Sequence, residues 1–198
     1  MMNIAGLVLA GGQGLRMGGA DKALLPLAGQ PLIAHVLARF APQVATVAIS
    51  ANGDLGRFAG CGFVVLSDNE ADTGPLAGVL AGLTWAAAQG ASWLATVAVD
   101  TPFFPDDMVA RLAAAPGGAV VVMAESLGRL HPTCGLWRVG LLPVLAAALA
   151  TGERRLARFA AHQGMVRVAF PAAGSDPFFN INHPADLAAA HLRLVAAG

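Results

Sequence analysis

The chain has 198 residues, with 12 Lys and Arg balanced by 12 Asp and Glu, so its formal net charge is zero. That balance excludes the broad basic surface typical of proteins that bind nucleic acid or anionic membranes. Charged residues are only 12 % of the sequence, about half the usual share, so any charge that directly follows a predicted strand is a candidate for function.

We expect one domain spanning residues 1–198, located in the cytoplasm. A chain of this length can bury a sizeable core, and no repeat, linker or block of like charges divides the sequence. The two cysteines, Cys61 and Cys134, lack the spacing of metal ligands, and the N-terminus lacks a secretory signal. The sequence therefore predicts reduced thiols in a cytoplasmic protein.

Apolar runs alternate with helical patterns along the chain, which is typical of a doubly wound α/β domain with a mostly parallel sheet and helices on both faces. The predicted strands are Ile4–Ala10, Val44–Ser50, Phe63–Leu66, Trp93–Val99, Ala119–Ala124 and Val166–Phe170, with Leu130–Arg138 as an antiparallel addition. The predicted helices are Pro31–Phe40, Leu76–Gln89, Pro105–Ala114, Leu141–Ala150, Arg154–His162 and Pro184–Val195. Ligands of such sheets bind beyond the carboxyl ends of the strands.

The uncharged span Thr73–Val99 is long enough to cross a bilayer. Gly74-Pro75 opens it, however, and a polar break at 89–92 interrupts it. A helix followed by a buried parallel strand explains the pattern better, because such strands are apolar on both faces. We therefore expect no membrane partner.

The segment Leu9–Lys22, LAGGQGLRMGGADK, follows the first predicted strand and carries five glycines within nine residues. Glycines allow backbone N–H groups to close around an anion, and Arg16 and Lys22 would neutralise it. The segment lacks the Walker A pattern, and Met17 occupies the third glycine slot of the dinucleotide pattern that starts at Gly12. A phosphate-binding turn is predicted, and the alternative is a glycine-rich surface loop without a ligand.

Two carboxylates follow predicted strands: Asp68 after Phe63–Leu66 and Asp100 after Trp93–Val99. Carboxylate oxygens are ligands that Mg²⁺ requires, usually together with substrate phosphates. The alternative for Asp100 is a cap on the next helix, but Asp106 could fill that role and leave Asp100 for a metal.

Weaker signals come from small and amide side chains. Gly74 and Gly78 both remove side chains where a base or ribose could lie against the backbone. Asn182 could be a simple N-cap of the last helix, which would leave Asn180 to face the site. His131, beside a proline in a predicted hairpin, is expected to be structural.

Seven motifs appear in order along the chain and together resemble the molybdenum cofactor guanylyltransferases, the MobA family of nucleotidyltransferases. The resemblance covers almost the whole chain, and its first motif, which ends in Gly18-Gly19-Ala20-Asp21-Lys22, is the most specific. The motifs are Leu9-Ala10-Gly11-Gly12, Arg16-Met17-Gly18-Gly19, Asp21-Lys22, Gly74-Pro75-Leu76-Ala77-Gly78, Asp100-Thr101-Pro102, His131-Pro132-Thr133 and Asn180-Ile181-Asn182.

The resemblance implies transfer of GMP from GTP to the terminal phosphate of molybdenum-molybdopterin, with release of pyrophosphate. It implies Mg²⁺ on Asp100, and it leaves open whether Asp68 reads the base, the ribose or the metal. Where the family often has Asn, this chain has Ser50, and Asn52 is the candidate substitute. Arg16, Lys22 and Asp100 are expected to serve catalysis. The expected nucleotide- and cofactor-binding residues are Leu9, Ala10, Gly11, Gly12, Lys22, Asn52, Asp68, Gly74, Gly78, Asp100, Asn180 and Asn182.

Partners also follow from the resemblance, which implies contacts with molybdenum-insertion proteins and molybdoenzyme chaperones. One rival is a cytidylyltransferase acting on the same cofactor, but those tend to have Ala-Ala-Gly in place of Ala10-Gly11-Gly12. Another is a sugar-phosphate nucleotidyltransferase, which usually has a larger C-terminal region. The rival from a different class is a non-catalytic nucleotide-binding or cofactor-handover module, against which Arg16, Lys22 and Asp100 together argue.

Overall fold

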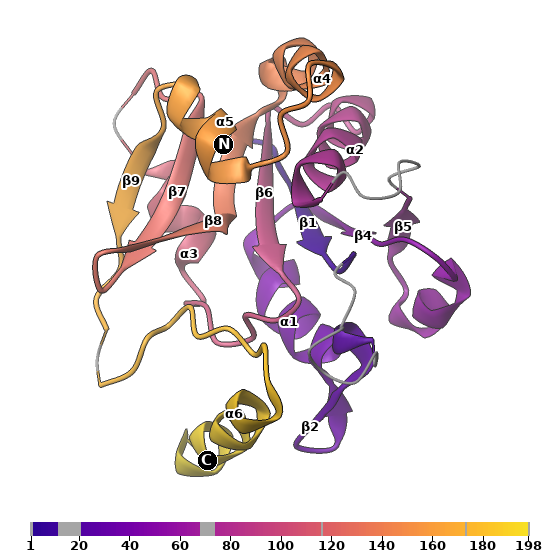
Figure 1. Cartoon of the computed structure of the whole chain (residues 1–198), viewed down its shortest axis with the longest axis vertical. Coiled ribbons are helices and arrows are strands. Elements are labelled where there is room, and N and C mark those ends of the chain that lie inside the picture. Colours follow the sequence, from indigo (N-terminus) through magenta and orange to yellow (C-terminus); the bar gives the residue numbers. More distant parts are fainter. Residues whose placement is uncertain (1, 12–20, 68–73, 116, 173, 198) are drawn as a thin grey trace.

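The computed structural model describes residues 2–11, 21–67, 74–115, 117–172 and 174–197 of the chain (Figure 1). The candidate residues Gly12, Arg16 and Asp68 lie outside the described residues.

A seven-stranded sheet forms the centre of the described structure, in the order β5-β4-β1-β6-β8-β7-β9 (Figure 1). The pairs β4–β5, β1–β4, β1–β6 and β7–β9 are parallel, which confirms the predicted mostly parallel sheet. The strands are β1 (Ile4–Leu9), β4 (Thr46–Ser50), β5 (Val64–Leu66), β6 (Trp93–Ala98), β7 (Val121–Ser126), β8 (Arg129–Arg138) and β9 (Val166–Ala169).

The predicted antiparallel addition is confirmed as β8, which pairs antiparallel with both β6 and β7. It lies inside the sheet rather than at its edge, since its residues 134–137 are buried. Gly135 allows the close approach there, because a Cβ at this position would lie 2.7 Å from the carbonyl oxygen of Val122.

Helices cover both faces of the sheet, as predicted (Figure 1). One face packs against α1 (Leu32–Phe40) and α3 (Met108–Ala113). The other face packs against α2 (Pro75–Ala88), α4 (Leu142–Ala150) and α5 (Leu156–His162). The division follows the two-residue period of a strand: in β1, Ala5, Leu7 and Leu9 face the second group, whereas Ile4 and Val8 face the first.

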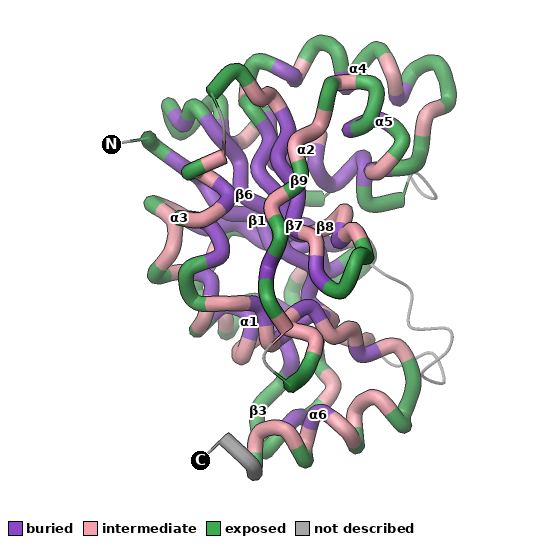
Figure 2. Tube along the Cα trace, turned by 90° about the vertical axis from the view of Figure 1, so that its left-hand side faces the viewer, coloured by how far each residue is buried: buried purple, intermediate pink, exposed green. Residues whose placement is uncertain are grey.

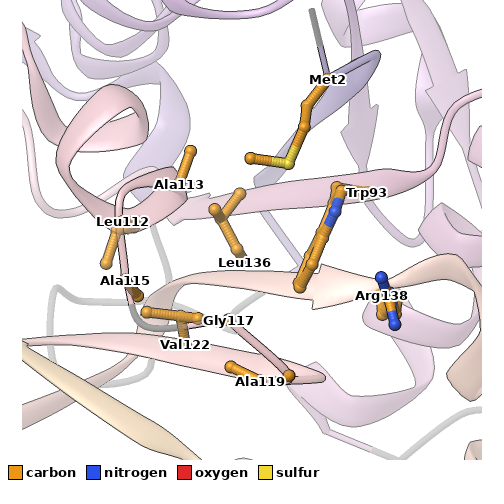
Figure 3. Close-up of a pocket in the computed structure, with 11 residues that line it drawn as sticks. Met2, Trp93, Leu112, Ala113, Ala115, Gly117, Ala119, Val122, Leu136 and Arg138 are labelled. Atoms are coloured by element: carbon orange, nitrogen blue, oxygen red, sulfur yellow. The ribbon is translucent and has the colours of Figure 1, made fainter.

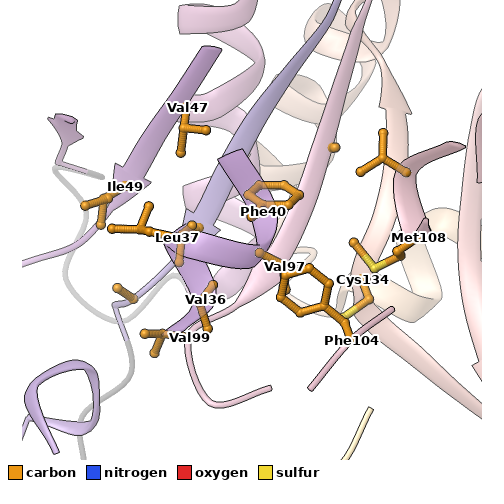
Figure 4. Close-up of a cluster of buried hydrophobic side chains, with 14 of the residues drawn as sticks. Val36, Leu37, Phe40, Val47, Ile49, Val97, Val99, Phe104, Met108 and Cys134 are labelled. Carbon is orange, nitrogen blue, oxygen red and sulfur yellow. The ribbon is translucent and has the colours of Figure 1, made fainter. Parts of the chain in front are cut away.

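The core on the α1 side is drawn in Figure 4, where Phe40 of α1 and Phe104 lie between the helix and the strands. Their rings meet edge to face with centroids 5.9 Å apart, a favoured aromatic geometry. Figure 2 shows that buried residues concentrate in the strands. Buried Cys134 belongs to this core, and burial raises the pKa of its thiol to about 12. Both cysteines are free thiols, as predicted.

The last helix, α6 (Pro184–Ala197), lies beyond the strand tips at the lower end of Figure 1. A small apolar cluster attaches it to the short strand β2 (Pro26–Leu27), which pairs with β3 (Gln30–Pro31), and to the start of α1. This cluster centres on Leu27, Leu32 and Ile181, which are fully buried. It therefore brings the C-terminal segment to the carboxyl edge of the sheet.

One helix start differs from the prediction. The helix expected from Pro105 begins at Met108, and its N-cap residue is Asp107, whose side chain makes no capping hydrogen bond. The interpretation of Asp106 as a cap is therefore wrong. Its carboxylate instead pairs with Arg39 of α1 at 2.9 Å.

The uncharged span after Gly74 forms α2 and then β6, which confirms the prediction of a helix followed by a buried strand. Every residue of β6 is buried. Within the described ranges, no helix is both long enough and apolar enough to cross a membrane.

Candidate active site

Three distant parts of the chain meet at the carboxyl edge of the sheet. Lys22 Nζ donates hydrogen bonds to Asp100 Oδ2 at 3.1 Å and to Asn182 Oδ1 at 2.7 Å. The side chains of Lys22 and Asp100 are only 15 % and 19 % exposed. Because nearby solvent is limited, the attraction between these two charges is screened less than in a typical surface pair. The structure thus joins three residues predicted for the site.

Lys22 begins a single 3-10 turn, η2 (Lys22–Leu24), which sets its position. Asp21 Oδ1 caps this turn by accepting from the backbone N–H of Ala23 at 3.0 Å. Ala23 is fully buried in the core on the α1 side. The base of the Lys22 side chain is therefore anchored by a cap and by packing.

Asp100 lies two residues after the end of β6, and its main chain is hydrogen-bonded to the C-terminal segment. The Asp100 carbonyl accepts from the N–H of Ile181 at 2.8 Å. Beside it, Thr101 Oγ1 donates to Asn180 Oδ1 at 2.8 Å. Asn180 and Asn182 therefore have different contacts: Asn180 contacts Thr101, and Asn182 contacts Lys22. Thr101 was not among the predicted site residues.

The interpretation of Asn182 as a simple N-cap of the last helix is wrong. Asp186 does the capping, since its Oδ2 accepts from the N–H groups of Asn182 and His183 at 2.8 Å each. A carboxylate in the first turn that reaches back to the preceding N–H groups is one half of a capping box. The bond from the Asn182 N–H lowers the pKa of Asp186. The Asn182 side chain is thereby left for Lys22.

The predicted nucleotide-binding strand end is built by β1 and β4. Leu9 and Ala10 are buried, and the Ala10 N–H donates to the Ser50 carbonyl at 2.8 Å. Asn52 Nδ2 lies 3.9 Å from the position that a Cβ on Gly11 would take. Asn52 Oδ1 is buried and has no hydrogen-bond partner within the described part of the chain. Asn52, rather than buried Ser50, therefore lies beside Gly11.

The two candidate glycines of α2 have different structural roles. Gly74 precedes the helix with φ +69° and ψ −169°, a conformation that is essentially restricted to glycine. Gly78 is buried, and a Cβ there would lie 2.6 Å from Ser50 Oγ and 3.1 Å from Leu9 Cδ2. The space that Gly78 leaves is thus filled by the protein, and this glycine lets α2 pack closely on the sheet.

His131 is structural, as predicted. It is 6 % exposed and stacks on Phe178 with ring centroids 4.6 Å apart. Ser126 Oγ donates to Asp176 Oδ1 at 2.6 Å and lies 2.7 Å from His131 Nε2. Since the hydroxyl hydrogen is used on the carboxylate, Nε2–H of His131 must be the donor to Ser126. Ser126 and Asp176 hold the His131 ring in place. This contact could not be predicted from the sequence, because Asp176 lies 50 residues from Ser126.

Stability is expected to fall as the pH drops below about 6.5, because the folded protein disfavours the protonated form of His131. Burial lowers the pKa of His131 from its ordinary 6.5, and Arg129 lowers it further, against Asp176 and Glu125. As the pH falls through 6.5, the unfolded chain therefore binds more protons at this histidine than the folded chain does, and the folded state loses stability. Asp176 stays ionised in this range, because hydrogen bonds from Ser126 and the Phe178 N–H outweigh burial and lower its pKa.

The measurement is the free energy of unfolding in urea at about pH 7.5 and about pH 5.5. The variant His131→Gln keeps a donor for Ser126 but cannot titrate, so its stability should change less between the two pH values. The matched control is His162→Gln at an exposed position. An unchanged pH dependence in His131→Gln would contradict the assignment.

The residues present fit a magnesium ion that takes most of its ligands from substrate. No group of three or more His, Cys, Asp or Glu side chains could hold a metal within the described residues. Mg²⁺ commonly needs only one or two protein carboxylates plus phosphates and water. Asp100 Oδ2 is used by Lys22, but Oδ1 has only a 3.4 Å contact with Thr101 Oγ1. One carboxylate oxygen at the strand end is therefore available to a cation.

A cavity of about 190 Å³ lies at the other edge of the sheet (Figure 3). Its lining includes Met2 before β1, Trp93 at the start of β6 and Arg138 at the end of antiparallel β8. All three positions lie at the edge opposite Asp100. This cavity is not part of the site formed by Lys22, Asp100 and Asn182.

The fold and the site together define an α/β enzyme of the nucleotidyltransferase class. A buried parallel strand leads into a glycine-rich segment, and a lysine and an aspartate form an ion pair at the adjoining strand end. The chain belongs to the family of the MobA-like NTP transferase domain, whose model matches residues 6–167.

Curated relatives are similar to this chain over nearly its full length. A molybdenum cofactor guanylyltransferase from Cereibacter sphaeroides is 56 % identical over 189 residues, covering 96 % of each chain. One from Rhodobacter capsulatus is 55 % identical over 195 residues, covering 98 % of this chain and 97 % of the relative. A crystal structure of molybdopterin-guanine dinucleotide biosynthesis protein A from Archaeoglobus fulgidus has a TM-score of 0.76 and 21 % identity, covering 97 % and 99 % of the two chains. This last likeness shows the fold.

Proposed function

We propose that the chain transfers GMP from GTP to molybdenum-molybdopterin and releases pyrophosphate. The observation that carries the proposal is the position of Lys22, whose ammonium bonds to Asp100 at the strand end and to Asn182 before α6. These two contacts link the expected nucleotide side of the site to the C-terminal segment. The guanylyltransferase relatives, which match nearly the whole chain, support the same activity.

The reaction needs alignment and charge neutralisation more than an activated side chain. The acceptor supplies its own phosphate oxygen, which attacks the α-phosphorus of GTP. One P–O bond forms, the bond to the β-phosphate breaks, and pyrophosphate leaves with the electron pair. In this proposal Lys22 donates to a phosphate oxygen, and Leu9, Ala10, Gly11 and Asn52 line the nucleotide.

Asp100 would hold Mg²⁺, which when bound offsets negative charge on the phosphates. The remaining candidates Gly12, Arg16 and Asp68 stay in the proposal as phosphate, base, ribose or metal contacts. Gly74 and Gly78 would act by shaping the start of α2, and Asn180 by holding the segment that carries Asn182. The cytoplasmic location and the contacts with insertion proteins and chaperones also stay predictions.

The test measures pyrophosphate release with Mg²⁺ and molybdenum-molybdopterin, with GTP and CTP offered separately. Release with GTP and not with CTP is the expected result. A preference for CTP would favour the cytidylyltransferase alternative. GTP binding without pyrophosphate release from either nucleotide would favour the binding or handover module.

A further inference from the structure

A second ion pair lies next to Lys22, and the proposed reaction does not use it. Arg57 Nε pairs with Asp21 Oδ2 at 2.5 Å, and the two side chains are only 19 % and 25 % exposed. Arg57 Nη1 also donates to the carbonyl oxygens of Asn52 at 2.7 Å and Asp54 at 2.6 Å. The guanidinium lies 4.6 Å from the ring centre of Phe58, which is fully buried. Arg57 is therefore held in one place by charge, hydrogen bonds and packing.

The partner of Arg57 is the residue that caps the Lys22 turn. Asp21 gives one oxygen to Arg57 and the other to the N–H of Ala23. An ion pair at one oxygen and a hydrogen bond at the other restrain the carboxylate in its capping orientation. Since Lys22 is the first residue of that turn, the orientation of Asp21 determines where the Lys22 side chain starts.

Arg57 also neutralises a carboxylate that would otherwise disturb the site. Asp21 precedes Lys22 in the chain, so without Arg57 an uncompensated negative charge would remain at the start of the turn that carries Lys22. It would also repel the triphosphate expected there. Pairing with Arg57 removes this negative charge while keeping the cap.

The stretch from Ser50 to Arg57 contacts the chain both before and after the glycine-rich segment, at Ala10 and at Asp21. On one side, the Ala10 N–H donates to the Ser50 carbonyl. On the other side, Asp21 pairs with Arg57, which is itself bonded to the Asn52 carbonyl. The ends that flank residues 12–20 are thus tied to one short piece of chain after β4.

We propose that Arg57 is a positioning residue for the nucleotide site: through Asp21 it aims Lys22 at Asp100 and Asn182. The proposal rests on the proposed guanylyl transfer for its effect on catalysis. Its structural part, the control of Lys22 by the Arg57–Asp21 pair, stands independently of which nucleotide is used.

The test compares Arg57→Met, Asp21→Asn and the double variant. Lys22 is the only lysine in the sequence, so protein labelled with ¹⁵N-lysine gives NMR signals from this residue alone. We expect Arg57→Met to shift the Lys22 signals and to raise the KM for GTP about tenfold. Adding Asp21→Asn removes the uncompensated charge, so the double variant should bind GTP no worse than Arg57→Met.

Two outcomes would overturn the proposal. In the first, the Lys22 signals of nucleotide-free Arg57→Met match those of the wild type. In the second, the losses of the two single variants multiply in the double variant, as expected if Arg57 acts independently of Asp21. If Arg57→Met does not fold, Arg57→Gln takes its place, since Gln keeps side-chain N–H donors without the charge and adds no second lysine to the labelled protein.

The matched control is Arg111→Met. Arg111 also stacks on a phenylalanine, Phe170 at 4.0 Å, and donates to a backbone carbonyl, that of Ala169 at 2.8 Å. The variant Arg111→Met should leave the NMR signals of Lys22 unchanged. Because the NMR measurement needs no nucleotide, a wild-type protein that fails to transfer GMP would contradict the proposed function and leave the Arg57 test intact.

Discussion

Guanylyl transfer is expected to fall about a hundredfold or more in Asp100→Asn, because the variant removes the carboxylate charge that pairs with Lys22 after β6. Asn has nearly the same size as Asp, so the packing around β6 should persist. Asp100 Oδ1 is the oxygen available to a cation, and a neutral amide is a poorer ligand for Mg²⁺. Pyrophosphate release from GTP, measured over a Mg²⁺ titration, should show both a lower maximal rate and a higher Mg²⁺ requirement.

The control for this variant is Asp107→Asn. Asp107 is an exposed aspartate in the same connection after β6, and its side chain makes no capping hydrogen bond. It should transfer GMP at the wild-type rate. The assignment of Asp100 fails if Asp100→Asn has the rate and the Mg²⁺ dependence of the control.

Much of the fold could be predicted from the sequence because each element carries its own local signal. The continuous apolar run of β6 is typical of a strand buried on both faces, and the structure buries all six of its residues. The turn before β8 predicted an antiparallel neighbour. What local pattern could not give was the place of β8 in the sheet, because strand order depends on pairing between distant segments.

Three of the residues predicted for the site, Lys22, Asp100 and Asn182, meet in the structure, but their contacts could not be predicted from the sequence. The positions of Lys22, Asp100 and Asn182 at element ends indicated a common edge. Their mutual bonds span 78 and 160 residues, and no spacing rule covers such distances. Helix capping misled for the same reason: Asp106 and Asn182 both have capping side chains, but Arg39 and Lys22 from other elements bind them.

Lys22→Met is expected to lower kcat/KM for guanylyl transfer about a hundredfold or more. An ammonium has three donors, and the structure uses one on Asp100 and one on Asn182. The third can serve a phosphate oxygen. The variant keeps the apolar length of the side chain but leaves the Asp100 carboxylate without its cation. Because Lys22 links both sides of the site, the KM for GTP and the KM for the acceptor should both rise.

Lys22→Arg should lose activity as Lys22→Met does, although it keeps the positive charge, since a planar guanidinium cannot place three donors around one point. Arg167→Met is the matched control, because it also removes the cation of an ion pair. Arg167 lies on the edge strand β9 and pairs with Glu125 of β7 at 3.0 Å. Reductive methylation of wild-type protein gives an independent check, since the chain offers the reagent one lysine and the N-terminal amine. GTP should protect Lys22 and not the N-terminus; equal modification with and without GTP would place the ammonium outside the nucleotide site.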